Sequence, residues 1–374
     1  MNARFHIEPS LKPIEGEIRS VLRLLSHQQK IELTPTADDA ITIGPDPHHH
    51  LTLSKPFFSR SLDQHIFRDN LILESDGKPD WIGSVFYMVN SLQEYDEAKR
   101  DSLGRFPFSS SYQFSHYVPC KNLVQNYLDE ICRLAHIPKR REPTAFFLSH
   151  DIDTVYRAWL EDGFYALRTG RIDILLKLLL NVATFRPDWL NIDRIIKLES
   201  EYDVRSAFFW IVNRGRIDKR LSNSDYTFTG RQIQKQLDLV EASGFENGIH
   251  KSLSDESFTS ELQKFGRSPR ANRYHFLKFS LPDGYRLIES SRLLIDASLG
   301  FAESIGFRNS YGLPFRPYDY EKQQPFSFVE VPLHVMDATY FTYKKWDPVK
   351  AQKEVVEFFE ANRFSLRQDG CAAP

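Results

Sequence analysis

Cysteine is scarce in this chain. Its 374 residues include Cys120, Cys132 and Cys371, and no two of them form a Cys-x-x-Cys pair. An odd, widely spaced set argues against both a disulfide framework and a zinc ribbon. An excess of charge of one sign is lacking too, since 48 basic and 50 acidic residues leave a formal net charge of -2. No chain-wide field draws nucleic acid or an anionic membrane, and we predict neither as a partner.

Long hydrophobic runs are also missing. The longest apolar stretch, 172–185, contains Lys177 and Asn181 and is shorter than the about 20 residues that span a membrane. It predicts an amphipathic core helix and no integral membrane segment. The first ten residues lack the short apolar run of a secretory signal. Together with the cysteine usage, these features predict a cytoplasmic protein.

Apolar residues suffice for a sizeable core, at 41% of the chain. The length exceeds one average domain, so we expect two. Residues 1–140 alternate short apolar pieces with Pro-rich and His-rich turns, which predicts a smaller α/β domain. The charged, proline-bounded segment 137–143 marks the boundary, and residues 141–374 form the second predicted domain.

The second predicted domain alternates apolar strands with amphipathic helices. Strands are expected at 145–149, at 206–212 and ending at His250, with helices at 171–181, 191–202 and 230–243. This alternation predicts a parallel sheet or barrel, in which functional groups gather at the carboxyl ends of the strands.

Potential metal ligands stand at these strand ends. Asp151 and Asp153 follow the first strand, and His250 ends a later one. Two carboxylates one residue apart can supply one metal ligand and one base, although such a pair alone is as often a helix cap or a turn. An imidazole at a second strand end favours a zinc-like site.

Three later segments add acids and imidazoles. They are Asn272-Arg273-Tyr274-His275-Phe276, Ile295-Asp296-Ala297-Ser298-Leu299-Gly300-Phe301 and Val331-Pro332-Leu333-His334-Val335-Met336-Asp337. For His334, two interpretations are about equally good: a structural histidine whose hydrogen bonds are satisfied at a strand end, or a catalytic acid.

Taken in order, the motifs resemble those of a known family. Ser-His-Asp-Ile-Asp, Gly-Ile-His-Lys-Ser, Arg-Tyr-His-Phe-Leu, Asp-Ala-Ser-Leu-Gly-Phe-Ala-Glu and Pro-Leu-His-Val-Met-Asp together resemble a bacterial branch of the polysaccharide deacetylases, carbohydrate esterase family four. The resemblance runs from about 144 to 345, and residues 1–140 resemble the accessory domain that often precedes such catalytic domains.

The resemblance implies a fold and an activity. The fold would be a distorted (β/α) barrel of the polysaccharide deacetylase type behind the smaller N-terminal α/β domain. The activity would be a metal-dependent hydrolase that removes N-acetyl groups from a sugar or polysaccharide, with zinc as the foremost divalent metal and an N-acetylated carbohydrate as the substrate.

The resemblance also assigns roles to individual residues. Asp151 matches the catalytic base, and Arg273 the arginine that orients the base carboxylate. Asp153 and His250 match metal ligands, and Asp296 falls in a further catalytic motif.

The chain departs from the family pattern at two places. Ser254 stands where the second histidine of His-x-x-x-His would be, so His275 is the predicted third metal ligand. The family's last motif, Leu-x-His, is missing, because no histidine follows His334 and residues 363–374 have the composition of a loose end. The catalytic domain therefore looks incomplete at its C-terminal end.

These departures leave three functions open. In the first, the chain is an active deacetylase in which His334 protonates the leaving amine. In the second, it is a truncated or impaired deacetylase that binds metal and carbohydrate without turnover. In the third, it hydrolyses a different amide, such as a small cyclic one. The sequence leaves the oligomeric state undetermined.

Overall fold

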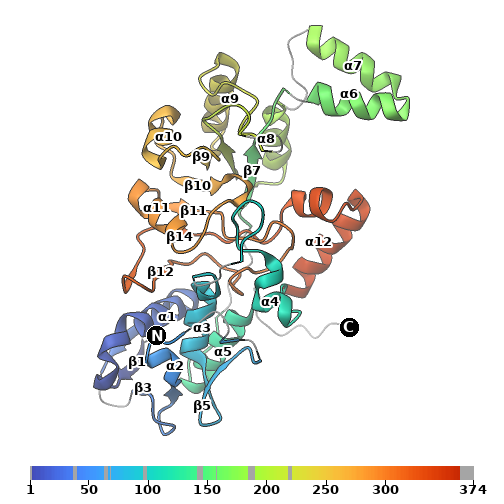
Figure 1. Cartoon of the computed structure of the whole chain (residues 1–374). Coiled ribbons are helices and arrows are strands. Elements are labelled where there is room, and N and C mark those ends of the chain that lie inside the picture. The colour runs from blue at the N-terminus through green and yellow to red at the C-terminus, as the bar shows by residue number, and fades with distance from the viewer. Residues whose placement is uncertain are drawn as a thin grey trace. The chain divides into compact units, whose positions relative to one another are not determined.

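The computed structural model describes residues 2–36, 40–62, 66–67, 69–95, 99–140, 146–156, 158–183, 190–217 and 221–362 (Figure 1). The chain divides into two compact units. The first unit comprises residues 1–145, 277–290 and 297–374, and the second comprises 146–276 and 291–296. The predicted second domain, 141–374, is therefore divided between them.

The first unit begins with a parallel sheet in the order β2-β1-β3-β4. Its strands are β1 (Asn2–Ile7), β2 (Glu32–Pro35), β3 (Ile41–Gly44) and β4 (Leu51–Thr52). Helix α1 (Glu15–Gln29) connects β1 to β2 and buries Ile18, Val21, Leu22 and Leu25, whose spacing places them on one helical face. The α/β character predicted for this part of the chain agrees with the sheet.

Two further helices of the first unit begin at capping side chains. Helix α3 (Trp81–Val89) starts after Asp80, whose carboxylate accepts a 2.7 Å hydrogen bond from the Gly83 N–H. Helix α5 (Leu123–Leu134) starts after Asn122. Each cap satisfies a backbone donor that the first turn leaves without an intrahelical partner. Burial raises the pKa of Asp80 to about 6, despite the hydrogen bonds that the carboxylate accepts.

The remaining elements of this unit are short, apart from α11 and α12. They are η1 (Pro9–Ile14), α2 (Lys55–Phe58), β5 (Leu73–Ser75), β6 (Lys78–Asp80), η2 (Leu92–Glu94), η3 (Phe108–Ser110), α4 (Tyr112–Ser115), α11 (Asp283–Ser291), β12 (Tyr318–Asp319), β13 (Gln324–Pro325), β14 (Val329–Glu330), η5 (Thr339–Tyr343) and α12 (Pro348–Asn362).

A buried ion pair joins early and late parts of the chain within the first unit. The guanidinium of Arg308 donates two hydrogen bonds, of 2.8 and 2.6 Å, to the carboxylate of Glu94, and both side chains are 1% exposed. Gly306, at φ 116°, approaches the carbonyl of Pro119 so closely that a Cβ would lie 2.1 Å from its oxygen. Such long-range contacts explain why residues after 296 group with the N-terminal part.

The second unit is built on five parallel strands in the order β11-β10-β9-β8-β7. They are β7 (Leu148–Ile152), β8 (Ser206–Trp210), β9 (Glu246–Lys251), β10 (Ala271–Tyr274) and β11 (Ile295–Asp296), and η4 (His275–Leu277) follows β10. All five residues of β8 are buried, as expected for a parallel strand covered on both faces. The predicted parallel sheet is confirmed.

The barrel implied by the family resemblance is not found. Strand β7 lies at one end of the strand order, and among the described residues it pairs with β8 alone, so the sheet is open. Alternating strands and helices favour parallel pairing, but closure needs the first and last strands to meet. The sequence pattern carries no signal for that last pairing.

Helices connect the strands of the second unit. They are α6 (Ala158–Thr169), α7 (Ile172–Ala183), α8 (Ile192–Glu201), α9 (Arg231–Ala242) and α10 (Phe258–Phe265). Helices α8 and α9 agree with the predicted ranges 191–202 and 230–243. Helix α7 agrees in position, but the prediction of a core helix is wrong, because it leaves large apolar side chains exposed. Among the described residues, no helix is both long and apolar enough to cross a membrane.

Replacing Arg308 with Met is expected to lower the free energy of unfolding by about 3–5 kcal/mol, because the carboxylate of Glu94 stays buried without its partner. Urea denaturation of the full chain, followed by circular dichroism, measures the loss. Arg19→Met is the matched control: Arg19 pairs with Glu15 on a solvent-accessible helix face, and breaking that pair should cost about 0–1 kcal/mol. Equal stability of the two variants would contradict the prediction.

Candidate metal centre

Three side chains converge at the carboxyl ends of neighbouring strands. Asp153 directly follows β7, His250 lies in β9, and His275 directly follows β10. The Oδ1 atom of Asp153 is 3.3 Å from Nε2 of His250 and 3.4 Å from Nδ1 of His275, and these two nitrogens are 3.2 Å apart. The structure thus brings together the three residues that were predicted to bind metal.

Strand register explains how residues so far apart in sequence meet. Ile152 pairs with Trp210, Trp210 with Ile249, and Ile249 with Asn272, so these residues form one row across the sheet. Asp153 and His250 each lie one residue beyond this row. Because all strands are parallel, their carboxyl ends share one edge, and polar groups that follow them gather there.

The spacing of the three candidate ligand atoms suits a tetrahedral ion, of which they would occupy three positions. Zinc binds His nitrogen and carboxylate oxygen at about 2.0–2.1 Å, and two such ligands in a tetrahedron lie about 3.3–3.4 Å apart. The measured separations of 3.2, 3.3 and 3.4 Å fall at or near this spacing. An open fourth position is typical of catalytic rather than structural zinc sites.

Backbone carbonyls set the tautomers of both imidazoles. Nδ1 of His250 lies 2.8 Å from the carbonyl oxygen of Arg273, and Nε2 of His275 lies 3.0 Å from that of Ser222. A carbonyl only accepts, so these nitrogens carry the hydrogens. In the neutral rings, Nε2 of His250 and Nδ1 of His275 are then left with lone pairs, as metal-binding histidines require. Two lone pairs and a carboxylate oxygen this close repel one another unless a metal cation, or a proton on Nε2 of His250, lies among them.

The surroundings shift the pKa of each member of this group. Burial alone would raise the pKa of Asp153, but the hydrogen bond to His250 and the electrostatic interaction with His275 lower it overall. Burial also acts to lower the pKa of His250, yet the carboxylates of Asp151 and Asp153 raise it. For His275, burial dominates and lowers the pKa. The carboxylate therefore stays ionised, and His275 favours the neutral form that binds a metal.

Asp151 lies beside the three candidate ligands without joining them. Its Oδ2 atom is 3.8 Å from Nε2 of His250, and its Oδ1 atom is 3.2 Å from Nη1 of Arg273. The same Nη1 donates a 2.7 Å hydrogen bond to Oγ of Ser149. The guanidinium also lies over the ring of Phe209, 4.9 Å from its centroid. Arg273 thus holds one oxygen of Asp151 and leaves the other directed toward the candidate metal position.

Two other residues discussed from the sequence have local partners. Ser254 accepts a 2.8 Å hydrogen bond from Asn213, and its hydroxyl lies 2.6 Å from that of Ser252. Asp296, at the buried end of β11, accepts a 2.7 Å hydrogen bond from Asn272 and is not among the converging atoms. The catalytic role of Asp296 stays a prediction.

His334 belongs to the first unit. Its Nε2 atom lies 3.4 Å from the carbonyl oxygen of Tyr311, and its ring packs edge-on against Phe307. Burial lowers its pKa to about 4. The imidazole is therefore neutral near pH 7 and has no extra proton to give. Its role as a general acid stays a prediction, and this pKa argues against it.

The loop that precedes α9 contributes residues that the sequence did not indicate. The carbonyl of Ser222 orients His275, and the hydroxyl of Tyr226 donates a 2.7 Å hydrogen bond to the carbonyl of Ile152. The same hydroxyl accepts from the N–H of Ile211. Backbone carbonyls and a lone tyrosine have no recognisable spacing, so no sequence signal could have identified them.

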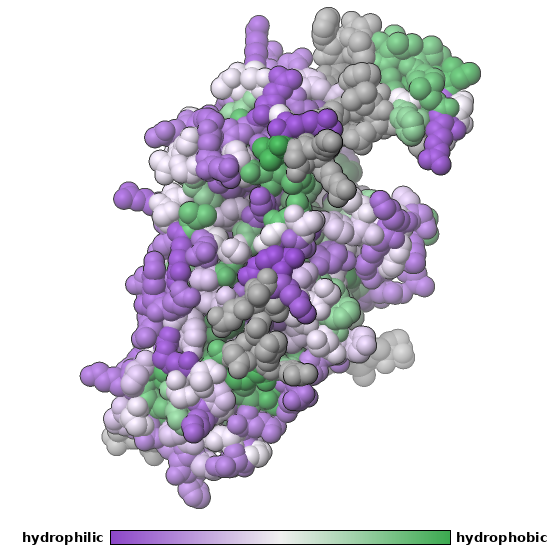
Figure 2. All heavy atoms as spheres, viewed as in Figure 1, coloured by the Kyte–Doolittle hydropathy of each residue, from purple (hydrophilic) through white to green (hydrophobic). Residues whose placement is uncertain are grey.

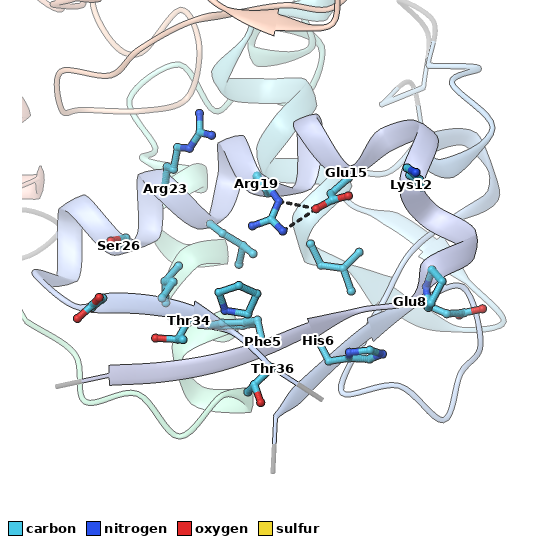
Figure 3. Close-up of a pocket in the computed structure, with 16 residues that line it drawn as sticks. Phe5, His6, Glu8, Lys12, Glu15, Arg19, Arg23, Ser26, Thr34 and Thr36 are labelled. Atoms are coloured by element: carbon cyan, nitrogen blue, oxygen red, sulfur yellow. Dashed lines mark hydrogen bonds and ion pairs between the residues drawn. The ribbon is translucent and has the colours of Figure 1, made fainter. Parts of the chain in front are cut away.

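A cavity of about 510 Å³ lies elsewhere, in the first unit, between α1 and the strands β1 and β2 (Figure 3). Glu15 and Arg19, paired on α1, line one wall, and Phe5 and Thr34 line the opposite wall. The cavity contains none of the predicted site residues. The candidate chemistry therefore belongs to the strand ends of the second unit.

Comparison with known proteins adds little to this geometry. The model of a family of unknown function, DUF7033, matches residues 21–136, which lie in the first unit. The crystal structure of a provisionally named polysaccharide deacetylase from Mycobacterium smegmatis aligns over 60% of this chain and 78% of its own, with 14% identity and a TM-score of 0.35. That likeness is too distant to carry an argument about this chain. A search of the curated proteins found no match to this chain.

Proposed function

We propose that this chain is a metal-dependent hydrolase that removes N-acetyl groups from a sugar or polysaccharide, with zinc as the foremost metal. The convergence of Asp153, His250 and His275 carries the proposal. The order of the sequence motifs, which resembles that of polysaccharide deacetylases, supports the choice of substrate.

The three residues fit the ion in number, atom type and tautomer. Two imidazole nitrogens and one carboxylate oxygen are a donor set that suits zinc. When bound in such a site, a divalent metal lowers the pKa of a water molecule and polarises the carbonyl to be attacked.

Asp151 is the proposed base. Oδ1 is held by Arg273, so Oδ2, the oxygen nearer His250, is available to accept a proton from the attacking water. Once protonated, Asp151 can return that proton to the leaving amine. Arg273 acts as a positioning residue, because its guanidinium donates hydrogen bonds to Asp151 and Ser149 and lies over the ring of Phe209.

A binding protein without turnover is the second candidate function. The low pKa of His334 favours this function. His334 was proposed to protonate the leaving amine, but its imidazole is neutral near pH 7. In this alternative the second unit keeps the metal and the carbohydrate but lacks an efficient proton donor.

Replacing His275 with Ala is expected to weaken zinc binding by more than about 100-fold, because one of three ligands is removed. Isothermal titration of the metal-free full chain with zinc measures the change. His150→Ala is the matched control: Nε2 of His150 lies 2.7 Å from Glu199, so this nearby imidazole is engaged elsewhere. Unchanged zinc affinity in His275→Ala would refute the metal site.

Replacing Asp151 with Asn is expected to reduce turnover by about 10²- to 10⁴-fold while the zinc content stays near that of the wild type. Asparagine keeps the shape of the side chain but cannot accept the proton from water. Acetate release from N-acetylglucosamine oligomers by the zinc-loaded chain measures the rate.

Three outcomes separate the candidate functions. Acetate released by the wild type, and lost in Asp151→Asn, supports the deacetylase. A wild-type chain that holds zinc and releases no acetate supports the binding protein. Hydrolysis of a cyclic amide, without acetate release from the sugar, supports a hydrolase that acts on a different amide.

A further inference from the structure

Helices α6 and α7 form a hairpin in which few of the described apolar side chains are buried. They are joined through Gly170, which adopts the left-handed conformation that commonly ends a helix (φ 68°), and the Arg171 N–H donates to the carbonyl of Ala166. Of the described side chains of the two helices, Ala166 and Leu178 are buried, and Leu178 of α7 packs near Gly163 of α6. Twelve-residue helices are marginal by themselves, so most of their stability must come from packing against something else.

Large apolar side chains cover the outside of this hairpin. Their exposed fractions are 69% for Phe164, 70% for Leu167, 68% for Ile172, 57% for Leu176 and 66% for Leu179. Figure 2 shows hydrophobic surface gathered over the two helices. Taking about 200 Å² for a fully exposed large side chain, these five present about 660 Å² of apolar surface. Patches of this size mark interaction sites.

The spacing of these residues fits a helical partner. Ile172, Leu176 and Leu179 stand at i, i+4 and i+7, which places them in one stripe along α7, and Phe164 and Leu167 stand at i and i+3 on α6. Stripes of this kind are the core-facing positions of helix bundles.

The charges of the hairpin favour a protein partner over a lipid surface. Residues 158–183 contain three acidic and three basic residues. Helices that bind anionic membranes carry an excess of Lys and Arg on the polar face, and this hairpin has no such excess.

We propose that the α6–α7 hairpin is a self-association surface, through which two copies of this chain pair into a four-helix bundle. An apolar patch on a twofold axis is its own complement, because both copies present the same residues. The apolar surface of the five side chains alone approaches the about 800 Å² per partner that a stable interface buries. The proposal does not depend on the metal centre.

Sedimentation velocity of the full chain tests the proposal. The wild type is expected to sediment as a dimer at micromolar concentration, and Leu176→Glu/Leu179→Glu as a monomer, with a dissociation constant raised by at least about 100-fold. Leu198→Glu is the matched control: Leu198 is a similarly exposed leucine, at 56%, on α8, and this variant should remain dimeric. Phe164→Glu/Leu167→Glu tests the other helix independently, and circular dichroism reports on folding.

Three results would overturn the proposal. A wild-type chain that stays monomeric at every concentration is the first. A dimer that persists in both double variants is the second, because it would place the interface elsewhere. The third is a monomer that floats with phosphatidylcholine–phosphatidylglycerol vesicles and loses that property in Leu176→Glu/Leu179→Glu, which would assign the hairpin to a lipid surface.

Discussion

The close approach of three electron-pair donors is the constraint on which the functional interpretation depends. Asp153 Oδ1, His250 Nε2 and His275 Nδ1 lie within 3.4 Å of one another. The carbonyls of Arg273 and Ser222 hold both imidazoles in the tautomers that direct lone pairs at the same point. Such an arrangement is unfavourable without a positive charge at its centre, and the spacing suits a tetrahedral divalent ion. The proposed chemistry of Asp151 follows, since its free oxygen lies next to this point.

His275, the proposed third ligand, illustrates how a neighbouring strand of a parallel sheet can supply a side chain to the same point. Ser254 stands where the motif that the sequence resembles has its second histidine, and the Ser254 hydroxyl accepts a hydrogen bond from Asn213. His275 comes instead from the end of β10, the strand next to β9, and reaches the same point. The sheet register makes this exchange possible, because parallel neighbours bring their carboxyl ends to one edge. A motif incomplete along the chain can therefore be complete in space.

The family resemblance and the structure agree on the second unit more closely than on the whole chain. The sheet is parallel and its strand ends carry the expected residues, but the sheet is open and not closed into a barrel. The Glu94–Arg308 pair shows that residues after 296 pack with the N-terminal part. An ion pair between residues with 213 others between them produces no periodic pattern in the sequence. The 3.6-residue apolar spacing of α9, by contrast, can be recognised from the residues of that helix alone.

Local patterns along the chain were enough to predict the buried strand β8, the helices α8 and α9, and the candidate ligands Asp153, His250 and His275. These predictions depend on short-range properties: apolar periodicity, helix ends, and the chemistry of residues that follow strands. Tertiary structure alone decided the open sheet, the division of residues 141–374 between two units, the exposure of α7 and the carbonyls that orient both imidazoles. Each of these depends on which distant segments come into contact, and contact between distant segments is a property of packing that no local pattern encodes.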